Sequence, residues 1–488
     1  MNDNNKQDKS KAQNTERNYV ISPFKFIMML LSTIIITAAV TAFAILSGNE
    51  KIISDDSQKR SEFVKLYAVY DTLNKNYYKK VEKEKLIDGA IKGMVSGLDD
   101  PYSEYMTSDE QKDFTESMQG DFQGIGTEIE EKDNKIMISS PIKGAPAHKA
   151  GVKSGDIIMA VDDKSVEGKS TQDVVKLVRG KKGTVVTLTL KRGDAEPFDV
   201  KITRDKIHMS SVEHTLQKDG TGIITVMKFQ EGTADEFTDA LKALHDKGMK
   251  QAVIDLRDNP GGYLDEAAKM ADVFLEKGKI IVQMEDVSGN KEILKASKDA
   301  DEITKDLPTV ILLNEGSASA SEVFAAALKD NGKAEIVGHK SFGKGIVQTA
   351  STFKDKSMIK YTEQKWLTPK STWIHKKGIS PDVKVDLPAY VHGQMLDADE
   401  VLTLHEKSEK VKSMEMGLDA LGFDTGKVDS TFDESTLYAV QNFQMENNLP
   451  VDGIMTGKTT EKFMSQLAKK IENDDVQLKR AIQEAKKK

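Results

Sequence analysis

The pattern of apolar and polar residues divides the chain into segments of different kinds. Its longest uncharged stretch, Phe26 to Leu46, spans about 21 residues, close to the ~20 that a helix needs to cross a membrane. A cleavable signal peptide has a shorter apolar core and a small-residue exit. Because basic residues precede the stretch and acidic residues follow it, we predict a retained transmembrane helix at 26–46. Residues 1–25 would be cytoplasmic, and the remainder of the chain after the helix would lie on the extracytoplasmic side of the cell membrane.

The next segment, 47–113, has helical periodicity. Between Ser61 and Leu98, apolar residues recur on two short faces. The first face holds Leu66, Val69, Tyr70 and Leu73, and the second holds Ile87, Ala90, Ile91 and Met94. We predict two amphipathic helices here. Such a pair is typical of a packing or dimerisation element, so a homo-oligomer is one expectation.

Residues 114–205 show the shorter repeat of a β-rich module. Apolar runs at 157–161 and 185–190 predict strands, and glycine-containing turns separate them. The stretch 170–179 carries valines at helical spacing and predicts a helix.

From 206 to 395, short apolar runs alternate with amphipathic stretches. This alternation is typical of an α/β layer architecture. The predicted strands are 222–227, 252–256, 280–284, 309–313 and 335–337, and the predicted helices include 234–244 and 265–275.

The segment 412–470 contains a weak repeat of about 23 residues. Val428–Thr436 has the same pattern as Val451–Thr459, and each copy predicts a turn that caps a helix. The tail 471–488 is rich in charge, so we predict a charged helix or disorder there. Together the segments predict a multidomain chain with α/β and α+β parts.

Composition narrows the chemistry. The 488 residues suffice for about three or four domains. A formal net charge of −8 gives no support for nucleic-acid binding. The absence of cysteine excludes disulfides, thiolate catalysis and cysteine-ligated zinc, and the 8 histidines show no metal-ligand spacing. We therefore expect no metal and no cofactor.

A turn of small residues, Gly316–Ser321, separates the predicted strand 309–313 from a helical stretch at 322–329. Such a turn lets a hydroxyl project, and the unpaired N–H groups of the helix start lie beside it. These are the requirements of a serine nucleophile and its oxyanion hole, which points to Ser319 and the N–H of Ala320. Taken alone, the run is more typical of a linker or of a serine that caps the helix.

Later in the chain, a lysine and a glutamine could activate that serine. Lys344 is flanked by glycines, and burial lowers the pKa of a lysine toward neutrality, which would make Lys344 a general base. Gln348 follows on the same face of an extended segment and could orient the amine. The spacing of Gly338, Gly343 and Lys344 also fits a phosphate loop. However, Gly345 stands where that loop needs serine or threonine.

The stretch 255–263 ends a predicted strand in Asn-Pro-Gly-Gly. Gly261 and Gly262 expose backbone N–H groups there, which could complete an oxyanion hole with Ala320. Alone, the same glycines would only mark a turn.

Together these motifs resemble the carboxyl-terminal processing (tail-specific) serine proteases. The resemblance rests on Asp-Pro-Tyr-Ser at 100–103, Asp-Leu-Arg-Asp-Asn-Pro-Gly-Gly at 255–262, Gly-Ser-Ala-Ser-Ala-Ser-Glu at 316–322, Phe-Gly-Lys-Gly at 342–345 and Gly-Ile-Ser-Pro-Asp-Val at 378–383. It implies a serine-type peptidase in which Ser319 is the nucleophile, Lys344 the base and Gln348 its support. A Ser-Gly-Arg-Ser turn that is usual in the family is replaced here by Lys370–Trp373.

Two flanking modules carry resemblances of their own. With the pattern Gly-Val-Lys-Ser-Gly-Asp-Ile-Ile at 151–158, residues 114–205 resemble a PDZ domain. This resemblance implies that a peptide adds as a strand beside Ile125–Ile129, with its carboxylate held by Gly124, Ile125 and Gly126. Residues 412–470 resemble the peptidoglycan-binding helical domain, although Ser430 and Asn448 stand where glycines are usual. The implied partners are proteins or peptides with free C-termini, and peptidoglycan.

Asp330 and one other function need separate weighing. Some descriptions of the family place an acid at this spacing in a Ser-Asp-Lys relay. About 16 Å of helix separates Asp330 from Ser319, and an acid beside Lys344 would raise the pKa that catalysis needs low. Solvation of the helix end is therefore the role we favour for Asp330. The alternative function is a non-catalytic, wall-tethered PDZ adaptor, against which the intact Ser319, Lys344 and Gln348 argue.

Overall fold

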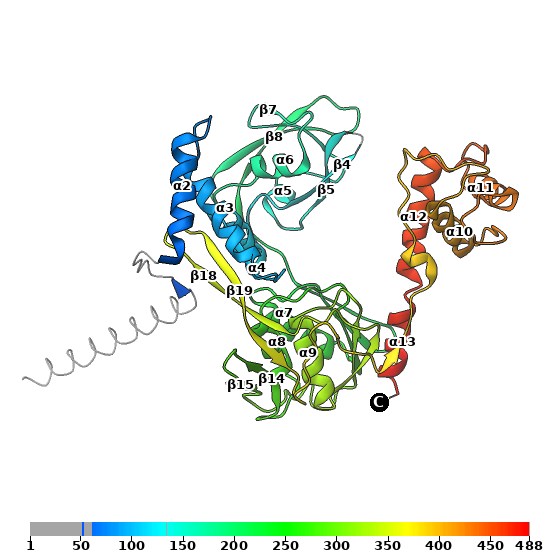
Figure 1. The fold of residues 1–488 in the computed structure, drawn as a ribbon. Helices are drawn as coiled ribbons and strands as arrows, with labels where there is room; N and C mark the ends of the chain where they lie inside the picture. The colour runs from blue at the N-terminus through cyan, green and yellow to red at the C-terminus, as the bar shows by residue number, and fades with distance from the viewer. Residues whose placement is uncertain (1–50, 53–60, 133, 488) are drawn as a thin grey trace, which may run out of the picture. The chain divides into compact units, whose positions relative to one another are not determined.

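The computed structural model describes residues 51–52, 61–132 and 134–487 (Figure 1). The transmembrane helix predicted at 26–46 lies outside these residues. Among the described helices, none is both long and apolar enough to cross a membrane. The chain forms two compact units, of which the first ends at Ser108 and includes Thr349–Tyr361, and the second holds the remaining residues from Asp109 onward.

The first unit contains both predicted amphipathic helices. Its elements are β1 (Lys51–Ile52), η1 (Ser61–Phe63), α2 (Val64–Asn76), α3 (Lys83–Ser96), β2 (Glu104–Met106), and parts of β18 (Ile346–Thr352) and β19 (Met358–Leu367). The hydroxyl of Tyr105 in β2 donates to Asp88 in α3 at 2.8 Å, which ties the strand to the helix. The apolar face of α2 remains exposed, because Leu66 retains 40% and Val69 50% of its surface.

The PDZ-like module contains a six-stranded antiparallel sheet, a separate two-stranded sheet and three helices. Its elements are α4 (Ser108–Gln119), β3 (Asp121–Gly124), β4 (Thr127–Lys132), β5 (Lys135–Pro141), α5 (Pro146–Lys149), β6 (Ile157–Val161), β7 (Lys164–Ser165), α6 (Thr171–Val178), β8 (Val185–Lys191), β9 (Phe198–Thr203) and β10 (Asp205–His208). The strand order is β4-β5-β6-β8-β9, so β4 lies at an edge. The boundary predicted at 113 falls inside α4, because Ser108–Gln119 forms one continuous helix.

The segment predicted to be catalytic has the expected α/β layer structure. Its elements are β11 (Val212–Leu216), β12 (Thr221–Val226), α7 (Thr233–Asp246), β13 (Gln251–Asp255), α8 (Leu264–Asp272), β14 (Ile280–Glu285), β15 (Lys291–Lys295), β16 (Thr309–Leu313), α9 (Ala320–Asp330), β17 (Ala334–Gly338) and β20 (Val383–Lys384). The sheet order is β11-β12-β13-β16-β17-β20, and the strands from β12 to β20 are parallel. The two neighbouring strands β14 and β19 pair antiparallel in a second sheet.

Side chains on alternate residues of the central strands enter two different cores. Ile254, Ile311 and Ile336 pack with the helices α7, α8 and α9 on one face. On the opposite face, Val253 and Val310 pack against the last helix of the chain, α13 (Val476–Ala485). This is the period-two alternation of a sheet that is covered on both faces.

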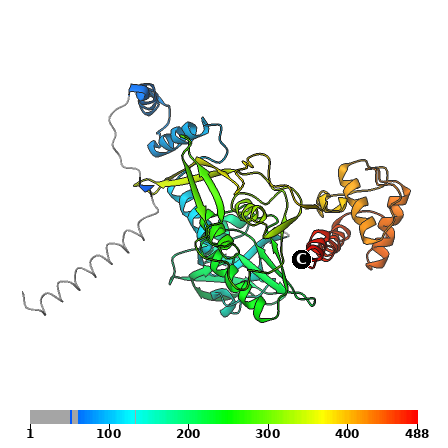
Figure 2. The same cartoon turned by 90° about the horizontal axis from the view of Figure 1, so that it is seen from below.

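The tail is helical, which is one of the two predicted outcomes, and its packing is what the sequence did not predict. One face of α13 is buried in the catalytic part, and Figures 1 and 2 show it in dark red beside the C-terminal mark. The boundary predicted at 470 also falls inside α12, which runs to Asn473. The sequence did not reveal this packing, because the charged residues Lys479, Arg480 and Glu484 are interspersed among the apolar residues of one short helix.

The repeat segment forms a small helical module. Its elements are η2 (Ala389–His392), α10 (Glu409–Leu421), α11 (Glu434–Glu446) and α12 (Gly457–Asn473), around a core that includes Phe432, Phe443 and Phe463. The side chain of Asp433 caps α11 by accepting from the N–H of Thr436, as predicted for the first copy, whereas Thr456 at the start of α12 makes no side-chain cap hydrogen bond. Ser430 and Asn448 adopt φ values of 72° and 53°, the left-handed conformation that glycine favours. The turn geometry is thus kept without glycine.

Candidate active site

Three loops meet at the carboxyl ends of neighbouring parallel strands. The loop after β13 carries the Asn-Pro-Gly-Gly motif, the turn after β16 carries Ser319, and the loop after β17 carries Lys344. Because β13, β16 and β17 are adjacent in the sheet, the order of the strands brings these loops to one edge. This is the position at which open α/β sheets bind their ligands.

The three serines of the Ser-Ala-Ser-Ala-Ser turn have different roles. The hydroxyl of Ser317 donates to Leu256 O at 2.7 Å, and that of Ser321 donates to Asn259 O at 3.0 Å, and both serines are fully buried. Ser319 is only half-buried. It also adopts φ 56° and ψ −113°, a strained conformation for a residue with a side chain. The outer serines therefore fasten the turn, and Ser319, which is the N-cap of α9, is the one left partly exposed.

The glycine motif packs directly against Ser319. A Cβ atom added to Gly261 would lie 2.8 Å from Ser319 Cβ and 3.0 Å from Ala320 N. Any side chain at position 261 would thus occupy the space beside the serine. The N–H of Gly261, which was predicted to face an oxyanion, donates to Asn259 Oδ1 at 2.9 Å within its own loop.

A buried glutamate joins the serine turn to the lysine loop. Glu322 Oε2 accepts from the backbone N–H of Ser319 at 2.9 Å and from that of Lys344 at 2.8 Å. Its Oε1 accepts from Ser341 Oγ at 2.5 Å and from the N–H of Gly343 at 2.7 Å. Burial raises the pKa of the Glu322 carboxyl, and these four hydrogen bonds oppose the shift.

Glu322 is a residue of the candidate site that the sequence analysis missed. It is the third residue of α9, and Ser-x-x-Glu before an apolar run is the signature of a capping box. That signature predicts the contact with the N–H of Ser319. It does not predict the three donors from residues 341–344, which only the fold brings to the same carboxylate.

The Lys344 loop has further support from behind. Two indole N–H groups donate to its carbonyls, that of Trp366 to Lys344 O at 2.9 Å and that of Trp373 to Gly345 O at 2.8 Å. The Gly-Ile-Ser-Pro-Asp-Val motif also packs here, since the N–H of Ile379 donates to Ser341 Oγ. Trp373 belongs to the replaced family turn, so the changed turn still reaches the loop.

The remaining predicted residues occupy different positions. Gln348 lies on β18, and its Nε2 atom is buried without a hydrogen-bond partner. Asp330, at the end of α9, accepts from the N–H of Lys370 at 3.0 Å, and so it holds the 370–373 turn. The N–H groups of Gly343 and Lys344, which a phosphate loop would offer to its ligand, donate to Glu322 instead.

The predicted peptide-binding loop connects β3, which pairs with β10 in a two-stranded sheet, to β4, the edge strand of the larger sheet. Gly124 ends β3, and β4 begins after Gly126. The carbonyl of Ile125 accepts from Ala147 N at 2.9 Å, and that of Gly126 accepts from Ile142 N at 3.0 Å. These bonds fix the loop through its carbonyl groups.

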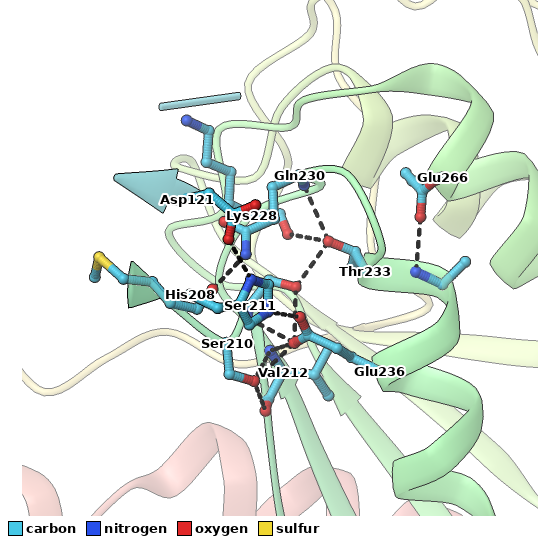
Figure 3. Close-up of polar contacts among 12 residues, drawn as sticks. Asp121, His208, Ser210, Ser211, Val212, Lys228, Gln230, Thr233, Glu236 and Glu266 are labelled. Carbon is cyan, nitrogen blue, oxygen red and sulfur yellow. Dashed lines mark hydrogen bonds and ion pairs between the residues drawn. The ribbon is translucent and has the colours of Figure 1, made fainter. Parts of the chain in front are cut away.

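The segment that joins this module to the catalytic sheet is held by Glu236 of α7 (Figure 3). Glu236 Oε2 accepts from Ser210 Oγ and from the N–H groups of Ser211 and Val212, at 2.7, 2.8 and 3.2 Å. Its Oε1 atom lies 2.7 Å from His208 Nε2, and the other ring nitrogen of His208 lies 2.9 Å from Asp121. The junction is therefore a polar network, with a half-exposed histidine between two carboxylates.

Comparison with known proteins identifies four regions of the chain. Residues 220–385 match peptidase family S41, and residues 37–110 match the activating protease CtpB N-terminal domain. Residues 137–192 match a PDZ domain, and residues 407–463 match a peptidoglycan binding domain family.

The chain is also similar to curated and solved proteins over most of its length. It is 47% identical over 463 residues to a "Probable CtpA-like serine protease" of Staphylococcus haemolyticus, covering 95% of this chain and 93% of the relative. A protein of the same description from Staphylococcus aureus (strain COL) is 45% identical over 464 residues, with the same two shares. Among solved structures, the photosystem II D1 C-terminal processing protease is 28% identical with a TM-score of 0.40, covering 71% of this chain and 92% of that one. The identity to whole curated relatives shows that the chain belongs to the carboxyl-terminal processing serine proteases of peptidase family S41.

Proposed function

We propose that this serine peptidase is a membrane-anchored endopeptidase that uses a Ser319–Lys344 dyad and captures substrates by an exposed C-terminus. The observation that carries the proposal is the bridge made by Glu322. One oxygen of its carboxylate accepts from the backbone N–H of both Ser319 and Lys344. The proposed nucleophile and the proposed base are thus held by a single atom, in a turn and a loop that have little freedom to separate.

The proposed reaction is acyl transfer. The neutral amine of Lys344 takes the proton of Ser319 Oγ as that oxygen attacks a substrate carbonyl. The N–H groups of Ala320 and Gly262 stabilise the oxyanion, since the N–H of Gly261 is engaged by Asn259. Lys344 then protonates the leaving amine, and water hydrolyses the acyl-enzyme. Gln348 accepts one N–H of the amine, which directs the nitrogen lone pair toward the serine.

Substrate capture is assigned to the PDZ domain. Its strand β4 is an edge strand, so its outer N–H and C=O groups can pair with an added peptide. The N–H groups of Ile125 and Gly126 would meet the terminal carboxylate. A tailed peptide should therefore bind, and the same peptide with an amidated C-terminus should not; equal binding of both would contradict this assignment.

The anchor and the cell-wall ligand are supported by sequence. The uncharged stretch 26–46 has the length and the flanking charges of a transmembrane helix with its N-terminus in the cytoplasm. The full chain should stay in the membrane fraction during alkaline carbonate extraction, and a variant without 26–46 should be released from it. The match of residues 407–463 supports peptidoglycan as a ligand of the C-terminal module.

The test of the dyad is casein digestion by the full chain in detergent. Ser319→Ala and Lys344→Ala should each lower kcat by at least about a thousandfold. The matched controls are Ser380→Ala and Lys340→Ala, two exposed residues that should leave turnover unchanged. Digestion by Ser319→Ala at the wild-type rate would refute the nucleophile, and normal turnover by Lys344→Ala alone would refute the base.

A further inference from the structure

We infer that Asp475, near the end of the chain, is a positioning residue for the catalytic centre, acting through Arg257 on the glycine loop beside Ser319. The inference rests on the proposed function, because it concerns the loop assigned to the oxyanion hole. Residues about two hundred positions apart in sequence form this contact.

Arg257 follows β13, in the Asp-Leu-Arg-Asp-Asn-Pro-Gly-Gly stretch. Its guanidinium donates to both oxygens of Asp475, from Nη1 at 3.0 Å and from Nη2 at 2.6 Å. It also donates from Nε and Nη2 to Asp255, at 3.0 and 2.7 Å, and from Nη1 to Gln477 at 3.3 Å. The side chains of Arg257 and Asp475 retain 17% and 21% of their exposure. A bidentate pair of this kind fixes direction as well as charge.

The loop that Arg257 begins is fastened to the serine turn. Leu256 O accepts from Ser317 Oγ, and Asn259 O accepts from the N–H of Ala318 at 3.0 Å. Gly261 then packs against Ser319. A shift of Arg257 would therefore pass along a short, hydrogen-bonded segment to the N–H groups that face the reacting carbonyl.

Asp475 is itself held in place by the helix it begins. It is the N-cap of α13, and it accepts from the N–H of Leu478 at 2.8 Å. Leu478, Ala481 and Ile482 pack on the outer face of the central sheet. Gln477 donates to Val385 O at 2.9 Å, just after β20.

The contact between Gln477 and Val385 shows how the peptidoglycan-binding-like module is attached. The chain leaves the catalytic sheet at Val385 and returns to it at Asp475, so the module is an insertion between two elements of the catalytic part. Both of its connections lie next to the Arg257 contact. Burial alone would raise the pKa of Asp475, but the hydrogen bonds from Arg257 outweigh burial and lower it, so the pair stays charged near neutral pH.

The test is Asp475→Asn in the full chain, assayed with fluorescein-labelled casein. Asparagine caps a helix about as well as aspartate, so α13 keeps its start. Its amide, however, presents a donor to a guanidinium that needs an acceptor. We expect kcat to fall roughly tenfold to a hundredfold, with KM within about twofold. Labelling of Ser319 by a fluorophosphonate should slow in parallel, while tailed-peptide binding should not change.

The matched control is Ile482→Ala, which removes packing from α13 without touching Arg257. It should lower the melting temperature and leave kcat unchanged below the melting range, whereas Asp475→Glu should restore part of the lost rate. Wild-type kcat in Asp475→Asn, or an equal loss of kcat in Ile482→Ala, would overturn the inference. If Ser319→Ala is inactive in the same assay, such a result refutes the role of Asp475 alone; if Ser319→Ala is active, the proposed function itself fails.

Discussion

Two glutamates in the first turns of neighbouring helices gather the N–H groups of an adjacent loop, and they differ in what else they touch. Glu322 in α9 is fully buried, and three backbone N–H groups and one hydroxyl donate to it. Glu236 in α7 keeps 21% of its side-chain exposure, and one of its partners is the His208 ring. Both positions suit a carboxylate, since the N-terminus of a helix favours negative charge.

The two glutamates also differ in their pKa shifts and in whether their hydrogen-bond partners titrate. Burial raises the pKa of Glu322 despite its donors. Burial also opposes ionisation of Glu236, but the hydrogen bonds from Ser210 and His208 outweigh it, and the pKa of Glu236 is lowered. Glu322 thus joins the catalytic loops through groups that do not titrate near neutral pH. Glu236 joins the PDZ domain to the catalytic sheet partly through a group that does.

The largest expected effect is that of Glu322→Gln. Each oxygen of Glu322 accepts from at least one backbone N–H, so an amide must place its NH₂ group against a donor in either orientation. We expect a loss of about 1–3 kcal/mol in the free energy of unfolding. We also expect kcat to fall at least about a hundredfold, because the Ser319 turn and the Lys344 loop lose their common partner.

Denaturant unfolding and casein turnover measure the two effects. The control is Glu276→Gln, an exposed glutamate whose side chain should tolerate the change. Glu322→Gln with wild-type stability and turnover would show that the carboxylate is not the element that holds the two loops together.

Glu236→Gln should destabilise the protein less than Glu322→Gln, and this difference tests the comparison directly. Only Oε2 of Glu236 accepts from the linker N–H groups, and a glutamine can keep an oxygen there while its NH₂ group faces the His208 ring. A neutral histidine can accept from that NH₂ group. We expect a cost below about 1 kcal/mol by thermal unfolding at pH 7. A loss as large as that of Glu322→Gln would erase the distinction between the two sites.

Local sequence patterns predicted most of the catalytic sheet. The strand expected at 309–313 is β16, and the strand expected at 252–256 is β13 within one residue. These strands are continuous apolar runs because both faces are buried. The cover on the second face could not be predicted in the same way. Its helix α13 is only 10 residues long and mixes apolar with charged residues, and it lies far along the chain from the strands that it covers.

The candidate site also contains residues that local sequence patterns predict and contacts that they do not. Ser319, Gly261 and Lys344 stand in motifs of small residues, where the need for close approach leaves a mark in the sequence. Glu322 and Arg257 stand in the same motifs, but their partners at 341–344 and at 475 come from other parts of the chain. A tertiary carboxylate contact leaves no periodicity, so no reading of spacing could assign it.

The smallest expected effect is the pH dependence of His208. The hydrogen bond to Glu236, followed by that to Asp121, raises the pKa of His208. Lys206 also faces this group, through Asp121. A doubly protonated ring donates to both carboxylates, whereas a neutral ring has one N–H. The contribution to stability is thus complete below the ordinary histidine pKa of about 6.5, and it is lost as pH rises through the raised value.

The melting temperature of His208→Gln should therefore be lower than that of wild type at pH 5.5 and should converge with it at pH 8.5. The difference at pH 5.5 should be worth less than about 1 kcal/mol, because the ring is half-exposed. The exposed neighbour His214→Gln serves as control, and Glu236→Gln should flatten the wild-type dependence. An equal difference in melting temperature between His208→Gln and wild type at both pH values would mean that the charge of His208 does not stabilise the junction. The contrast with Glu322 would then rest on burial and not on charge.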